Sequence, residues 1–283
     1  MNKRRLQVNV SGGRTSAYMA SWLKENLSDT YEMLFIFANT GQEHEDTLRF
    51  VNDVDVHFGL NLVWVESVVH HDERTSSTHR VVNYTSAARN GEPFEEVIKK
   101  YGICNHTHLH CTREMKRNSI DSYTRKLWGN DYDVALGIRA DEKRRVSPHA
   151  ADRNIIYPLV DLNPTSKDEV LEWWGQYDWD LKIPEHLGNC VTCYKKSAKK
   201  LNMVYRECPK AFEFFARMER EHSLDRLETD GIREPRYFFR GYTSTERLLK
   251  QFSDADMDTS KQFKEDESGG CSESCEPYQM ELL

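Results

Sequence analysis

The sequence predicts an α/β protein with a doubly wound, mostly parallel sheet of five strands. Short apolar stretches at residues 6–10, 33–37 and 61–65 alternate with helical stretches that each carry one apolar stripe. Strands and helices that alternate at this spacing form parallel sheets, and ligands bind at the carboxyl ends of such strands. We therefore expect the functional residues in the turns that follow the strands.

The composition is that of a globular chain with a polar surface. Of the 283 residues, 38% are hydrophobic and 30% are charged, and no apolar run reaches the roughly 20 residues that a membrane helix needs. The net charge of −7 argues against nucleic-acid binding by bulk charge, though not against a local basic patch. The start of the chain has no apolar signal region. These features predict a cytoplasmic protein without a membrane partner.

The first turn, residues 11–16 (SGGRTS), joins the strand at residues 6–10 to a helix at residues 17–26. Two adjacent glycines allow a tight turn, and the backbone N–H groups of the turn and the helix start form an anion cradle. Hydroxyl groups and one guanidinium add further donors. The segment predicts a phosphate site, and an ordinary turn with Ser/Thr caps is the alternative. Its residues are Ser11, Gly12, Gly13, Arg14, Thr15 and Ser16.

The second strand, residues 33–37, ends in a turn at the same edge of the predicted sheet. This turn holds Asn39, Thr40 and Gly41, and a helix follows it. Two loops that converge on one crevice indicate a nucleotide site more strongly than one loop alone. Residues 68–93 form a long polar excursion, which we expect to be a solvated loop or a lid over the crevice.

The later strands lead into basic segments. A helix opens near Cys111 and carries Lys116, and a strand at residues 132–137 runs into residues 137–145 (GIRADEKRR). Arginines at the carboxyl end of a strand can hold an oxyanion in a bidentate manner, whereas a solvated charge run is the alternative. A fifth strand at residues 155–159 precedes a helix that contains two tryptophans.

The seven cysteines favour thiols or metal ligands over disulfides, because the chain shows no secretion signal. Cys190 and Cys193 form a C-x-x-C, and with Cys104 and Cys111 they supply the four thiols that a closed zinc or [4Fe–4S] site requires. Three interpretations stay open: an iron–sulfur cluster, a zinc ion, or free thiols. Zinc would suit the alternating histidines His106, His108 and His110. A lysine-rich helix after Cys193 is either solvated or contacts an acidic or RNA partner.

Taken in order, these segments resemble the phosphoadenosine phosphosulfate (PAPS) reductase family, within the PP-loop ATP pyrophosphatase or adenine nucleotide alpha hydrolase-like superfamily. The turn at residues 11–16 resembles the SGGxxS pyrophosphate loop, and residues 37–41 resemble F-x-D-T-G with Asn39 in place of Asp. Residues 111–116 resemble C-T-x-x-x-K, and residues 137–145 resemble the arginine-rich G-I-R-x-D-E segment. The resemblance implies catalytic roles for Lys116 and Arg139. It implies nucleotide contacts by residues 11–16 and by Asn39, Thr40, Gly41, Gly137, Arg139, Asp141, Arg144 and Arg145.

The resemblance implies an enzyme that binds an adenine nucleotide, either PAPS or ATP. Sulfonucleotide reduction, with a thiol protein such as thioredoxin as reductant, is slightly favoured. The alternatives are ATP-dependent adenylation with sulfur transfer in nucleic-acid modification, and a nucleotide- or cluster-binding sensor without turnover. The chain lacks the E-C-G-x-H segment of the thiol-dependent reductases, so in the reductase interpretation Cys271 or Cys275 would have to take its place.

The domain organisation follows from these motifs. Residues 1–187 form the predicted nucleotide-binding α/β domain, and residues 188–252 form a helical C-terminal region that contains cysteines. From residue 253 the composition turns acidic and apolar periodicity stops, so residues 253–283 are expected to be a flexible tail.

Overall fold

A single mixed sheet forms the centre of the computed structural model, which describes residues 3–72, 74–225 and 234–254. The strand order is β4-β3-β2-β1-β5-β6, and every neighbouring pair is parallel except β3 and β4. The α/β class and the mostly parallel sheet are as predicted, but the described sheet has six strands rather than five. The strands are β1 (Arg4–Asn9), β2 (Tyr31–Ala38), β3 (Val63–Val68), β4 (Thr78–Val82), β5 (Asp133–Ala135) and β6 (Ile155–Ile156).

The additional strand, β4, lies within the segment expected to be a loop or lid. It pairs antiparallel with β3 at the edge of the sheet, where Val65 faces Val81 in the register. Edge strands tolerate charged and half-exposed side chains, so β4 lacks the apolar signature of a buried strand. The expected fifth strand is shorter than predicted, because Pro158 starts a helical turn directly after β6.

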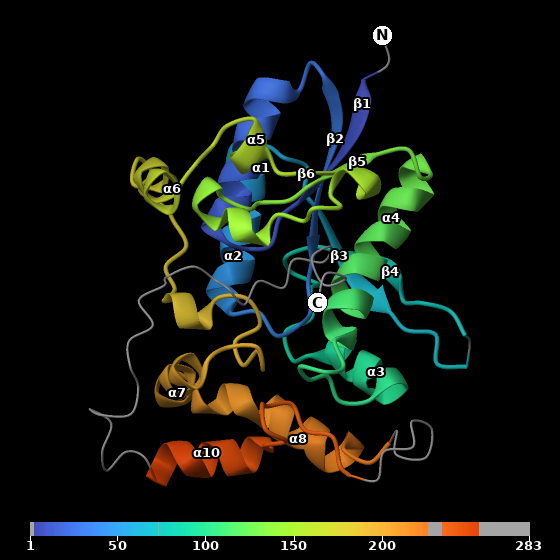
Figure 1. Cartoon of the computed structure of the whole chain (residues 1–283), viewed down its shortest axis with the longest axis vertical. Coiled ribbons are helices and arrows are strands. Elements are labelled where there is room, and N and C mark those ends of the chain that lie inside the picture. Colours follow the sequence, from blue (N-terminus) through green and yellow to red (C-terminus); the bar gives the residue numbers. More distant parts are fainter. Residues whose placement is uncertain (1–2, 73, 226–233, 255–283) are drawn as a thin grey trace.

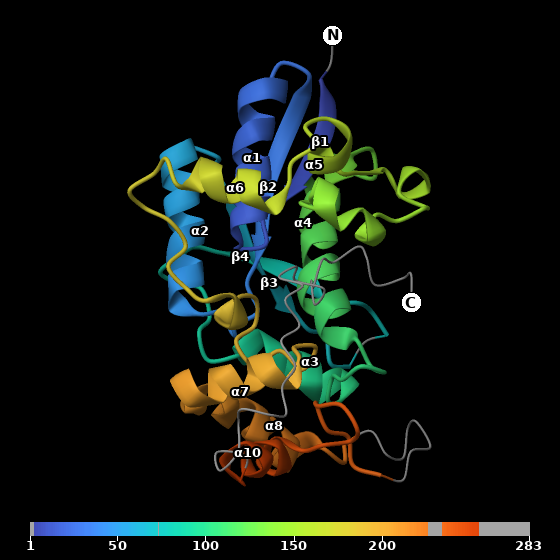
Figure 2. The ribbon, with the colours of Figure 1, turned by 60° about the vertical axis from the view of Figure 1, so that its left-hand side comes forward.

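Helices connect the parallel strands and cover both faces of the sheet (Figures 1 and 2). A short π-helix precedes α4 and contains two of the predicted site residues. The helices are α1 (Arg14–Leu27), α2 (Glu45–Phe58), α3 (Glu92–Tyr101), the π-helix η1 (Cys111–Arg117), α4 (Asn118–Trp128), α5 (Pro158–Asp161), α6 (Lys167–Trp174), α7 (Ala198–Glu207), α8 (Glu213–His222) and α10 (Thr245–Asp254).

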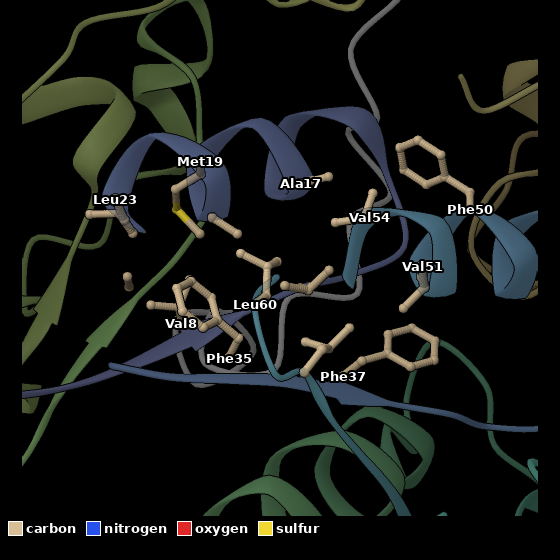
Figure 3. Packing of buried hydrophobic residues seen from close by; sticks show 14 of the residues in the cluster. Val8, Ala17, Met19, Leu23, Phe35, Phe37, Phe50, Val51, Val54 and Leu60 are labelled. Carbon is tan, nitrogen blue, oxygen red and sulfur yellow. The ribbon is translucent and has the colours of Figure 1, made fainter. Parts of the chain in front are cut away.

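The main hydrophobic core lies between one face of the sheet and helices α1, α2 and α6. Figure 3 shows Val8 and Phe35 from the sheet facing Met19 and Leu23 of α1, and all four side chains are buried. A second cluster packs α4 against the other face. The sheet is therefore covered on both sides, as expected for a parallel sheet whose strands are continuous apolar runs.

Helices α7, α8 and α10 gather at one end of the molecule together with α3 (Figures 1 and 2). Their shared core contains Val97 and Ile98 of α3, Val204 of α7 and Phe215 of α8. Thus α3, which lies within the predicted first domain, packs with the predicted C-terminal region. Within the described ranges, no helix has the length and apolar composition needed to cross a bilayer.

Candidate nucleotide and thiol site

The turn after β1 is an open backbone cradle at the start of α1. Gly12 has φ +81°, and a Cβ there would lie 2.7 Å from Thr47 Cγ2, so the turn requires glycine at this position. A Cβ on Gly13 would meet no atom within 4 Å, so the space in front of this residue is open. The first turn of α1 has neither an acidic residue nor a side-chain cap. Its N–H groups therefore face an open space that suits an anion.

Hydroxyl groups hold the cradle in shape. The Ser16 hydroxyl accepts a hydrogen bond from Ser11 N at 3.0 Å and donates to the Gly13 carbonyl at 3.0 Å. The side chain of Arg14 differs from the expectation, because its guanidinium pairs with Asp180 at 2.8 Å and also bonds the Leu181 carbonyl. Arg14 thus anchors the turn to the segment after α6 and does not supply the expected charged fork.

The segment after β5 meets this cradle, as the sequence predicted. The strand order reverses between β1 and β5, which is the position where ligands bind in open α/β sheets. A Cβ on Gly137 would lie 3.1 Å from Ser16 Cα, so the two backbones are in close approach. Arg139 is nearly buried and donates to the Thr15 hydroxyl at 3.4 Å. The cradle and the arginine segment therefore share one crevice.

The charges of the arginine segment are largely compensated within the segment itself. Arg139 pairs with Asp141 at 3.0 Å and with Glu142 at 3.4 Å, and Arg145 also pairs with Glu142. Burial raises the pKa of Asp141, but the hydrogen bond and the charge of Arg139, together with backbone hydrogen bonds, outweigh it and lower the pKa. Arg144 is exposed. The segment is thus a folded ion-pair network and not a row of solvated arginines.

The turn after β2 has a framework role that the sequence did not reveal. Asn39 is fully buried and donates to Glu66 at 2.6 Å and to the Ala88 carbonyl at 2.9 Å. Arg80 of β4 bonds the other oxygen of Glu66 at 2.6 Å. The Asn39 side chain is therefore engaged with β3 and the segment after β4, where it holds the turn rather than facing the crevice.

Three thiols from distant segments line one small cavity. Cys111, Cys190 and Cys193 face it together with Thr40 and Lys116, and its remaining walls are mostly apolar. The cavity measures about 20 Å³, which is room for about one water molecule. All three cysteines are buried. This thiol cavity unites residues that the sequence assigned separately to a nucleotide and to a metal.

Local structure explains how these residues meet. A π-helix closes its turns with i→i+5 hydrogen bonds, as from Asn118 N–H to the Arg113 carbonyl, and so brings residues five apart to the same side. Cys111 and Lys116 are five apart and line the same cavity. The C-x-x-C loop is fixed by a backbone bridge between Cys190 and Glu43 and by the Thr40 hydroxyl, 3.3 Å from Cys190 Sγ.

Tyr194 is a member of this site that the sequence analysis missed. Its hydroxyl lies 3.2 Å from Cys111 Sγ, and it also lines the thiol cavity. Burial raises the pKa of Tyr194 well above its usual value. Its position directly after Cys193 was the only available signal, and no pattern in the sequence connects it with Cys111.

Cys104 takes a different place from the other three thiols. It is completely buried beside Cys111, and it is not among the residues that line the cavity. Burial raises the pKa of the Cys104 thiol well above its usual value. It packs in the core formed with α3, as a small hydrophobic residue does.

The alternating histidines, which the sequence suggested as zinc ligands, contact different partners. His106 contacts the Tyr194 carbonyl at 3.0 Å, His108 contacts Asn105, and the His110 ring stacks on Tyr101. Burial lowers the pKa of His110 to about 4. Among the described residues, one group of three possible metal ligands has donor atoms within 4.8 Å of one another: Glu95, Glu221 and His222. Each of these side chains forms an ion pair with a neighbouring residue.

The lysine-rich segment after Cys193 was expected to be a helix that is solvated or contacts a partner. Lys196 is buried and donates to the Val191 carbonyl at 2.8 Å, so it fixes the C-x-x-C loop instead of facing a partner. Helix α7 begins only at Ala198. Cys271 and Cys275 lie outside the described residues.

Comparisons with known proteins give the following relatives. No family model matches the chain. It is 23% identical over 234 residues to the uncharacterized protein MJ0066 of Methanocaldococcus jannaschii, covering 78% of this chain but only 42% of that protein, less than half its length. Among solved structures, the U34-tRNA thiolase NcsA from Methanococcus maripaludis, with its [4Fe–4S] cluster, shows a TM-score of 0.43 and 16% identity over 88% of this chain and 74% of that chain.

A phage protein is similar over nearly its whole length. The uncharacterized nin region protein ORF290 of Escherichia phage lambda is 31% identical over 288 residues, which cover 97% of this chain and 96% of that protein. Both chains thus align almost from end to end. On this identity and coverage, the chain belongs to the family of the lambda nin region protein ORF290.

Proposed function

We propose that this chain is a PP-loop enzyme that binds ATP, transfers its adenylyl group to an acceptor and releases pyrophosphate, in the service of sulfur transfer during nucleic-acid modification. The observation that carries the proposal is the open cradle at residues 11–16, next to Arg139 and at the reversal of strand order. A pyrophosphate leaving group needs several backbone donors at once, and the uncapped start of α1 offers them.

In this proposal each group has a defined task. The amides of the cradle hold the β- and γ-phosphates, and Arg139 and Lys116 offset the charge that develops at the α-phosphate. An acceptor oxygen forms a bond to the α-phosphorus while the bond to the β-phosphate oxygen breaks, so that pyrophosphate leaves with the electron pair. Gly137 permits the close backbone approach to Ser16 that positions these groups.

Sulfonucleotide reduction receives less support from the geometry. A reductase needs a reactive thiolate, whereas Cys111, Cys190 and Cys193 are buried around an apolar cavity. Cys104 is buried in the neighbouring core, and Cys208 is half-buried. The expectation of thioredoxin as a partner belongs to this less favoured function.

The spacing of the thiols, though not the volume of the cavity, suits a thiolate-bound iron–sulfur cluster better than a single zinc ion. Tetrahedral zinc with thiolate bonds of about 2.3 Å brings its ligand atoms to within about 4 Å of one another, and no such set of thiols occurs among the described residues. We propose Cys111, Cys190 and Cys193 as the ligands, and Tyr194 as a donor to Cys111. Bound there, the cluster would supply iron that takes soft sulfur ligands. The closed cavity would have to widen to admit it.

Titration of the whole protein with ATP and PAPS side by side tests the proposal. We expect calorimetry to show tighter binding of ATP, and incubation with ATP and small RNA to release pyrophosphate. PAPS with thioredoxin should yield no sulfite. Release of sulfite from PAPS, without pyrophosphate release from ATP, would establish reduction instead. Nucleotide binding with neither product would identify a sensor.

A further inference from the structure

An open groove of about 750 Å³ lies beside the thiol cavity. Its walls come from the segment after β2, the segment before α3, and helix α8, and Figure 1 shows α8 at the end of the molecule that also carries α7 and α10. We propose that this groove binds a segment of single-stranded nucleic acid, with a base stacked on Phe214 and the backbone phosphates near Lys210 and Arg220. The inference rests on the proposed function and supplies its acceptor site.

The first argument is that groove and cavity share a wall. Thr40 lines the cavity, whereas Gly41 and Glu43 line the groove. The same alternation occurs along α8, where Phe215 lines the cavity and Phe214 lines the groove. A strand lying in the groove is thus separated from the three thiols by one layer of residues.

The second argument is the aromatic platform. Phe214 is half-buried, and the Arg217 guanidinium lies 5.6 Å from its ring centroid. A Cβ on Gly91 would lie 2.4 Å from the ring, so the absence of a side chain there makes room for Phe214. Aromatic rings flanked by arginine are the usual stacking surface for bases of single strands, and stacking tolerates any base. The part of the Phe214 ring that lines the groove offers such a surface.

The third argument is the local charge. The groove is lined by four cationic side chains and two carboxylates, although the whole chain carries −7. Arg89 and Arg217 are held in ion pairs with Glu45 and Glu95, which leaves Lys210 and Arg220 as the exposed cations. Within the part of the chain that the structure describes, Arg220 has only a loose surface pair with Glu246, at 3.7 Å, of the kind that contributes little. Lys210 and Arg220 are both exposed in the groove, where phosphates can reach them.

Fluorescence anisotropy of the full chain with a labelled 12-nucleotide RNA, and with DNA of the same sequence, tests this inference. Phe214→Leu keeps an apolar side chain but removes the ring, and should weaken binding by about fivefold or more. Phe214→Tyr should bind as the original protein does. Lys210→Glu and Arg220→Glu should each weaken binding and lower the slope of log affinity against log salt by about 0.7. Lys126→Glu, an exposed site on α4, is the matched control and should change neither.

The outcomes separate the inference from the function on which it rests. Unchanged binding by Phe214→Leu, equal loss in Lys126→Glu, or equal affinity for a duplex of the same sequence would overturn the groove assignment. Pyrophosphate release from ATP without binding of either single strand would also overturn it, while leaving the adenylation proposal intact. RNA and DNA measured in parallel show which strand the groove prefers.

Discussion

The two adjacent glycines of the first turn have different physical roles. Gly12 has a positive φ and no room for a Cβ, whereas Gly13 has extended backbone angles and open space in front of it. Substitution of Gly12 therefore acts on the fold, and substitution of Gly13 acts on the ligand. This difference permits a clean test of the phosphate cradle.

Gly13→Val should weaken ATP binding by about tenfold or more, because its side chain would occupy the space in front of the amides and remove charge-assisted hydrogen bonds. Its cost in stability should stay within about 1 kcal/mol, since valine is only a poorer N-cap. Gly12→Ala should instead destabilise the fold by roughly 1–3 kcal/mol. Calorimetry and urea unfolding of both variants measure the two effects, and unchanged ATP affinity in Gly13→Val would remove the cradle assignment.

Asn39 gives a second prediction at the scale of one residue. Asn39→Asp restores the residue of the family pattern, but it places a second carboxylate against Glu66, which is now 2.6 Å from the Asn39 amide. We expect a loss of roughly 3–5 kcal/mol at pH 8, against roughly 2 kcal/mol for Asn39→Ala. The negative charge of Glu66 raises the pKa of the introduced carboxyl in the folded state, so stability is lost as pH rises through that pKa.

Urea unfolding of the two Asn39 variants at pH 5 and pH 8 checks this prediction. The difference between Asn39→Asp and Asn39→Ala should shrink at pH 5, where the introduced carboxyl retains its proton in the fold. A difference that is constant with pH would show that the carboxylates do not interact.

At the scale of elements, the sequence predicted most of the sheet but not its polar edge. The continuous apolar runs of β2 and the alternation of β1 are strong signals, because both strands are covered by helices. Strand β4 carries exposed and half-exposed residues such as Arg80, and only its pairing with β3 defines it. The π-helix could not be predicted from the sequence either, because its hydrogen-bond register goes with the packing of Cys111 and Met115 in the core.

Helix α8 is joined to α10 by one buried carboxylate. Glu219 accepts hydrogen bonds from Phe238 N at 3.0 Å and from Thr245 N at 2.6 Å. Glu219→Ala would leave two buried N–H groups without this acceptor, and should cost roughly 2–4 kcal/mol. Glu221→Ala on the same helix is the control, and should cost about 1 kcal/mol or less because it removes only a surface ion pair.

The pH dependence of this contact has a defined sign. Burial raises the pKa of Glu219, so its contribution to stability is greatest at low pH and declines as pH rises through the folded-state pKa. The free-energy difference between the original protein and Glu219→Ala should therefore be larger at pH 4 than at pH 8, as measured by urea unfolding. A larger difference at pH 8 would contradict this assignment.

At the scale of the whole molecule, the thiol cavity joins parts that the sequence divides. Its residues come from the turn after β2, α3, the π-helix, the C-x-x-C loop with Tyr194, and α8. Motif order predicted that the glycine turn and Arg139 meet, because strand ends in a parallel sheet share one edge. No such rule places a C-terminal helix beside a thiol. The positions of Tyr194, Phe215 and Cys104 could therefore be recognised only in the three-dimensional structure.

The arrangement of the thiols leads to a prediction about metal loading. Anaerobic reconstitution with iron and sulfide should give about four of each per chain, with the absorption of a [4Fe–4S] cluster. Cys111→Ala, Cys190→Ala and Cys193→Ala should each lose most of this iron, because each removes a thiol that faces the cavity. Cys104→Ala should retain it, since Cys104 packs behind Cys111. Equal iron loss in Cys104→Ala would restore a four-cysteine site, and stoichiometric zinc in a colourless protein would exclude the cluster.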